Sequence, residues 1–196
     1  MGLGGLIFCE WKSVAKEYPD FQRSWGELEQ RITEKCRNDW SPRNMGFLVT
    51  HENEFGRTSI LPRLFLGWAS QTLPTWRQGM GIAGNQLILQ GVNAGMTIPE
   101  DIKIAWIGLA FPNKQQQISE IKFQIGDRKY GRINIEEMLG YHTPAIIFEE
   151  GFIIDEEQDF DMYAYIKEPD YQRVVMLGAA YYKFVDKVLG VPGAVI

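Results

Sequence analysis

The chain has 196 residues, a formal net charge of −5 and a hydrophobic fraction of 45% beside 23% charged residues. This length suits one domain with a sizeable core, and the composition excludes wholesale disorder. Two cysteines exclude a disulfide scaffold and a four-cysteine zinc site. The acidic balance makes nucleic acid an unlikely direct partner, because such binders neutralise phosphates with basic residues.

We expect the apolar segment 1–10 to carry no targeting signal. It has no basic region, and Leu6 stands where a myristoylation motif beginning at Gly2 requires Ser or Thr. No apolar run reaches about 18 residues, so we predict no membrane span. Cys9 and Cys36 are interpreted as reduced thiols, which is consistent with a cytoplasmic location.

The spacing of apolar residues predicts an amphipathic helix over residues 21–38, with Ser24 and Glu27 at the spacing of a capping box. This helix either covers its own domain or docks on another subunit. One stripe with the 3.6-residue period consists of Phe21, Trp25, Leu28, Ile32 and Cys36.

From about residue 45 the pattern predicts short β-strands. Segments 118–125 and 159–166 alternate, with Tyr163 and Tyr165 on the outward face of the second. Segment 171–184 is apolar on both faces, which is typical of a central strand covered on both sides. The predicted strands are 45–50, 57–68, 85–92, 102–110, 118–125, 129–135, 144–148, 151–154, 159–166 and 171–184.

Turn residues separate these strands. Gly126-Asp127 predicts a tight hairpin, and Asn134 predicts the start of one short helical turn. We therefore expect a mainly β fold, an antiparallel β-sandwich (jelly-roll-like) with an N-terminal amphipathic helix. The expected parts are an arm and helix at 1–44, a β-sandwich domain at 45–187 and an apolar tail at 188–196.

Two motifs with a chemical interpretation lack the context that this chemistry needs. The run Gly79–Gly84 matches G-x-G-x-x-G, but a strand pattern follows it where a dinucleotide site requires a helix. His51 and His142 are the two histidines of the chain, which is too few for a histidine-based metal cluster. The sequence therefore predicts no catalytic residue, no cofactor and no metal site.

Acidic residues concentrate in residues 136–170, where 11 acids accompany one base, Lys167. Four interpretations stay open, namely a solvated rim, a calcium site, the paired carboxylates of a glycosidase and a contact with a basic partner surface. The densest part, the acidic patch, consists of Asp155, Glu156, Glu157, Asp159 and Asp161.

Tryptophan residues suggest an alternative function, because flat aromatic rings on a β-sandwich can stack on sugars. Trp106 alternates with Ile102 and Ile104 and is predicted to lie in the core. Trp76, in a polar loop, and Trp68 are the candidates for a carbohydrate-binding surface.

Both terminal segments are apolar, although chain ends are usually polar unless they are tied down. They either fold onto their own sandwich or contact a neighbouring subunit as an arm or an added strand. Together with helix residues Trp25, Leu28 and Ile32, the predicted partner-binding residues are Leu3, Leu6, Ile7, Phe8, Ala194, Val195 and Ile196.

Three runs carry a resemblance over residues 100–185, namely Phe148–Asp155, Asp159–Ile166 and Arg173–Lys183. In them the chain resembles small β-sandwich structural proteins of virus particles, of the capsid, decoration or head–tail type. The resemblance implies a non-enzymatic protein in a symmetric virion shell, assembled in the host cytoplasm. It also implies that the partners are copies of itself and other structural proteins. The alternative is a carbohydrate-binding module, followed by a glycan-acting hydrolase.

Overall fold

The computed structural model describes residues 19–40, 55–65, 75–93, 95–140 and 145–183. In these residues the chain is mainly β, with antiparallel sheets and one long helix near the N-terminus, as predicted. Several predicted features lie outside the described residues: strand 45–50, Cys9, His51, Trp68, His142 and the apolar segments 3–8 and 188–196.

The first sheet has four antiparallel strands in the order β1 (Phe55–Ser59), β11 (Val175–Lys183), β4 (Ile102–Ala110) and β8 (Ala145–Ile154). β4 has the predicted bounds. β8 joins two predicted strands, 144–148 and 151–154, into one. The join is irregular, because Gly151 has a φ of 63° and the β4–β8 register shifts between Trp106 and Gly108.

The second sheet has the order β3 (Gly84–Gln90), β9 (Phe160–Ile166), β5 (Ile118–Ile125) and β6 (Arg128–Lys129), with β7 (Ile133–Asn134) also paired to β5. The predicted hairpin at Gly126-Asp127 is confirmed, because Ile125 pairs with Arg128. The predicted strand 129–135 is present only as the short β6 and β7. The helical turn is confirmed as α3 (Ile135–Gly140), where Asn134 Oδ1 accepts the backbone N–H of Glu136 at 2.9 Å.

Strands β2 (Arg77–Met80) and β10 (Asp170–Arg173) form a two-stranded ladder that continues the β3–β9 ladder. Met80 pairs with Asp170 and Gly84 pairs with Ile166, so both strands are interrupted at the same place and resume in the same register. The run 79–84 is therefore the end of one strand, a bend and the start of a second strand.

Two further predicted strands also differ in their extent. Segment 171–184 divides at the buried Val174 into β10 and β11, which belong to different sheets. In segment 57–68, β1 ends at Ser59 and a 3₁₀ helix, η1 (Pro62–Leu64), follows. Proline at the first helical position explains this end, because it cannot donate a ladder hydrogen bond.

One hydrophobic core contains side chains of both sheets, and Trp106 of β4 is at its centre. As predicted, this side chain is fully buried. Its ring lies 4.7 Å from Phe123 and 5.8 Å from Phe160, both of the second sheet, and its Nε1 donates to the carbonyl of Gly108 at 2.7 Å. The predicted inward faces of β5 and β9 are confirmed by burial of Ile121, Phe123, Ile125, Phe160, Met162, Ala164 and Ile166.

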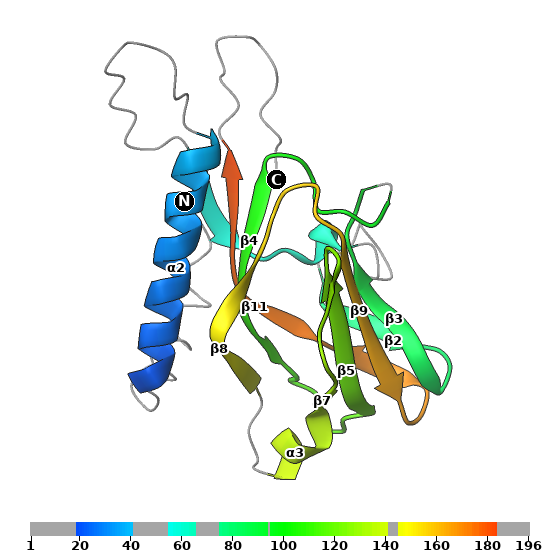
Figure 1. Ribbon diagram of the computed structural model, residues 1–196. Coiled ribbons are helices and arrows are strands. Elements are labelled where there is room, and N and C mark those ends of the chain that lie inside the picture. Colours follow the sequence, from blue (N-terminus) through cyan, green and yellow to red (C-terminus); the bar gives the residue numbers. More distant parts are fainter. Residues whose placement is uncertain (1–18, 41–54, 66–74, 94, 141–144, 184–196) are drawn as a thin grey trace, which may run out of the picture.

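Helix α2 (Pro19–Trp40) covers the outer face of the first sheet, so that helix, first sheet and second sheet follow one another as layers (Figure 1). Its stripe residues Leu28, Ile32 and Cys36 are fully buried in a cluster that includes strand residues of β4 and β11. The stripe therefore covers the chain's own sheet, the first of the two alternatives. Because the helix begins at Pro19, the capping box predicted at Ser24 is wrong. No helix among the described residues is long and apolar enough to cross a bilayer.

Candidate functional site

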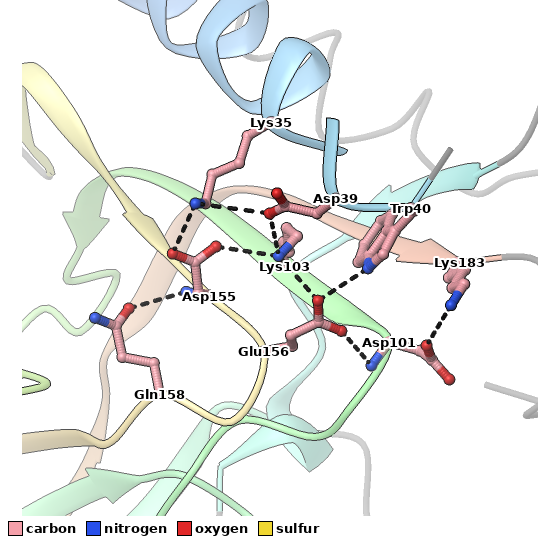
Figure 2. A network of polar contacts seen from close by, with 9 residues as sticks. All are labelled: Lys35, Asp39, Trp40, Asp101, Lys103, Asp155, Glu156, Gln158 and Lys183. Carbon is pink, nitrogen blue, oxygen red and sulfur yellow. Dashed lines mark hydrogen bonds and ion pairs between the residues drawn. The ribbon is translucent and has the colours of Figure 1, made fainter. Parts of the chain in front are cut away.

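A buried lysine on the helix-facing side of β4 forms the centre of a network of polar contacts (Figure 2). Lys103 has 2% of its side chain exposed, and its Nζ lies 3.1 Å from Asp39, 3.2 Å from Asp155 and 3.1 Å from Glu156. The Trp40 ring centroid is 5.2 Å from the same nitrogen. We call these five residues the lysine clamp, because they join the C-terminal end of α2 to β4 and to the loop after β8.

The carboxylates of the clamp have further donors. Glu156 accepts hydrogen bonds from Trp40 Nε1 at 3.0 Å and from the backbone N–H of Asp101 at 2.9 Å. Asp155 also forms an ion pair with Lys35 at 3.3 Å. A buried charge is tolerated only where it is paired and hydrogen-bonded, and this network meets that condition for Lys103.

The contacts of the clamp favour the charged forms of Lys103, Asp39 and Glu156. Burial lowers the pKa of Lys103, but the hydrogen bonds and charges of its three carboxylates outweigh burial, so its pKa lies above the usual 10.5. A hydrogen bond from Lys103 lowers the pKa of Asp39. Burial by itself would raise the pKa of Glu156. The hydrogen bonds that it accepts from Lys103, Trp40 and the backbone of Asp101 have the larger effect, so its pKa lies below the usual 4.5. A nucleophilic lysine needs the opposite shift, so the clamp is suited to structural fastening.

Cys36 lies in the same region, and its thiol is not suited to act as a nucleophile. Its thiol is fully buried under the helix, and burial raises its pKa to about 12. Catalytic cysteines have lowered pKa values, because the thiolate is the nucleophile. Cys36 is therefore a core residue and, as predicted, a free thiol.

The N-terminal half and the middle of α2 are fastened by a different set of contacts. Arg57 of β1 lies 5.6 Å from the centroid of the half-buried Trp25 ring and forms an ion pair with Glu29. Arg31 donates to the backbone carbonyl of Glu150 at 3.3 Å. Trp25 packs against the cluster that contains Leu28, Ile32 and residues of β4 and β11. These three predicted partner-binding residues therefore pack against the chain's own β-strands.

The acidic patch divides into two parts. Asp155 and Glu156 bind the chain's own Lys103, whereas Glu157 and Asp159 are exposed. Asp161 is half-buried, and burial, followed by the charge of Asp159, raises its pKa. Among the described residues, no group of three metal-ligating side chains is placed to hold an ion. The basic surface that two of the five acids contact therefore belongs to this chain.

A groove of about 260 Å³ lies on the outer face of the second sheet. The predicted outward Tyr163 and Tyr165 of β9 both line it. Its remaining lining residues come from β3, from β5 and from the segment before β7, and they are Asn85, Glu120, Ile121, Lys122 and Arg132. With one carboxylate among these residues, the groove does not contain the pair that a glycosidase needs.

Trp76, the aromatic residue on which the carbohydrate alternative depended, lies elsewhere. It is half-buried, packs against the core and has its ring centroid 6.3 Å from that of Phe65. The outward tyrosines of β9 are a more open aromatic surface, because Tyr165 is 49% exposed.

Comparison with known proteins finds no matching family model, no matching curated protein and no matching solved structure. The function proposed below is therefore argued from the geometry of this chain alone.

Proposed function

We propose that this protein is a non-enzymatic structural subunit of a virion or a similar large assembly, built as a jelly-roll β-sandwich. The observation that carries the proposal is the strand order. When β2 with β3, β6 with β7 and β9 with β10 are each counted as one interrupted strand, the described residues contain eight strands, which we letter B to I in chain order. The sheets then have the orders B-I-D-G and C-H-E-F, and eight strands shared between two sheets in this way support the proposed jelly roll, an architecture that viral capsid domains use.

The position of Trp40, the clamp residue at the end of α2, also supports this proposal. Trp40 ends α2, and its ring lies 6.2 Å from that of Phe55, which begins β1. Phe55 pairs with Lys183, the last residue of β11. The end of α2, the start of β1 and the end of β11 therefore lie together at one end of the first sheet.

The apolar segments supply the proposed subunit contacts. Because the stripe of α2 is buried within the chain, helix residues such as Leu28 and Ile32 are not proposed as partner contacts in the folded subunit. We assign the contacts to residues 3–8 and 188–196, whose apolar side chains would bind neighbouring copies or other structural proteins of the assembly.

Light scattering on the purified protein tests this proposal, which is necessary because jelly rolls also occur in lectins and cupins. We expect the full chain to form a multimer of defined mass, and variants lacking residues 1–10 or 190–196 to dissociate into subunits that still unfold cooperatively, with a midpoint lowered only by the loss of subunit contacts. The matched control is Tyr171→Ala, a change at an exposed strand position that leaves both segments intact. A full chain that is a stable monomer, and that stays monomeric when these segments are removed, would overturn the proposal.

A further inference from the structure

We infer that the groove on the outer face of the second sheet is a binding site for one sugar ring of a glycan. This inference does not rest on the proposed assembly function, since the groove is formed by β3, β5, β9 and the segment before β7 of a single chain. Its volume of about 260 Å³ is just below the roughly 300–1,000 Å³ of typical pockets for drug-sized ligands, which suits a small ligand.

The strand register places the lining side chains in two rows. In one row Tyr165 lies between Asn85 of β3 and Glu120 of β5. In the next row Tyr163 pairs with Lys122 of β5, whose Nζ is 5.2 Å from the centroid of the tyrosine ring. Side chains that alternate along paired strands share one face, so both rings and their polar neighbours face the same solvent space.

This arrangement matches the chemistry of a sugar ring. An aromatic ring offers an apolar surface for the C–H face of a pyranose, and the exposed ring of Tyr165 supplies that surface. Around it are an amide at Asn85, a carboxylate at Glu120 and a guanidinium at Arg132, which together can accept and donate hydrogen bonds to ring hydroxyls.

The ion pair in the groove favours hydroxyl groups over phosphate. Arg132 Nη1 lies 2.8 Å from Glu120 Oε2, so the guanidinium is already paired with a carboxylate. A phosphate beside Arg132 would also be beside the Glu120 carboxylate and would be repelled by it. A neutral hydroxyl can donate to the carboxylate and accept from the guanidinium without that repulsion.

A glycan array followed by calorimetric titration tests the inference with the full chain. We expect the wild type to bind at least one glycan of the array, and Tyr165→Ala to weaken that binding at least about tenfold. Asn85→Ala should also weaken binding, because it removes a hydroxyl partner. Tyr171→Ala is the matched control, since Tyr171 is 59% exposed, lies on β10 and does not line the groove.

Each variant is first checked by thermal unfolding, so that a loss of binding is read only from folded protein. The inference is overturned if the wild type binds no glycan on the array above the level of Tyr165→Ala. It is also overturned if Tyr165→Ala and Tyr171→Ala reduce binding equally, since that result would locate the ligand outside the groove.

Discussion

Replacing Lys103 with methionine removes the central charge of the lysine clamp while keeping a long apolar side chain. Removing one partner of a buried ion cluster costs about 3–5 kcal/mol. The three carboxylates keep between 24% and 40% of their side-chain surface exposed, so water can solvate them after the change. We therefore expect the low end of that range, about 3 kcal/mol. For a domain of this size that corresponds to a drop of about 6–12 °C in the unfolding midpoint.

The assay is thermal unfolding of Lys103→Met beside Lys35→Met as the matched control. Lys35 belongs to the same network, but it and its partners Asp39 and Asp155 are each 32–40% exposed, so its removal should cost less than about 1 kcal/mol. Hydrogen exchange should speed up in α2 of Lys103→Met, because the clamp fastens the end of that helix. Equal midpoints for the two variants would refute the reasoning that burial makes Lys103 central.

Comparing Lys103→Met with the wild type gives the pH dependence of the clamp. Asp39 and Glu156 have lowered pKa values, so their contribution to stability is present above the usual values of 3.8 and 4.5 and is lost as the pH falls through the lowered values. Lys103 has a raised pKa, so its contribution is present below 10.5 and is lost as the pH rises above that value. The difference in midpoint between wild type and Lys103→Met should therefore be constant from about pH 5 to pH 10 and shrink in acid. A difference that grows on acidification would contradict these assignments.

Three further predictions concern individual positions. In a Cys9→Ser background, Cys36 should react with a thiol reagent only at the rate of helix undocking, and rapid labelling of the native protein would contradict its burial. Asp161→Asn should raise the unfolding midpoint at neutral pH, because burial disfavours the ionised carboxylate, and the gain should disappear in acid, where Asp161 is protonated. Gly151→Ala should destabilise by about 1–3 kcal/mol, since its φ is 63° and the new Cβ would lie 2.5 Å from a side-chain atom of α2. Gly131→Ala, which meets nothing within 4 Å, should change stability little in the same unfolding assay.

Parts of the fold could be predicted from the sequence where the hydrophobic pattern alone decides the structure. The bounds of β4 and β5 follow from a long apolar run and from strict alternation, and both strands have the predicted residues. The division of 171–184 could not be predicted, because both halves favour strand and only the partner changes at Val174. Tertiary pairing, which no local pattern encodes, places β10 beside β2 and β11 beside β4.

Lys103 was missed because a lysine that alternates with isoleucine in a strand normally faces solvent. A usable signal was nevertheless present. Lys103 shares a face with Ala105 and Ile107, so that face of the strand is otherwise apolar and suited to burial under α2. A lysine on such a face needs carboxylate partners, and the acidic patch contains two of them, Asp155 and Glu156.

Only the two tyrosines of the groove could be predicted from the sequence. Alternation in β9 predicted that Tyr163 and Tyr165 face outward, and both do. Their neighbours Asn85 and Glu120 come from strands far away along the chain, and the register between strands decides which side chains meet. That register follows from packing of the whole core.

The central claim is that this chain is one of many copies in a large particle, and the mass of the protein in a gentle extract of its natural source tests it most directly. Sedimentation of that extract, followed by detection of the chain in each fraction, gives the answer without any added tag. We predict that the protein sediments with a large particle and is released only when the particle is dissociated. Recovery of the protein entirely as a free monomer of 22.5 kDa would contradict the claim.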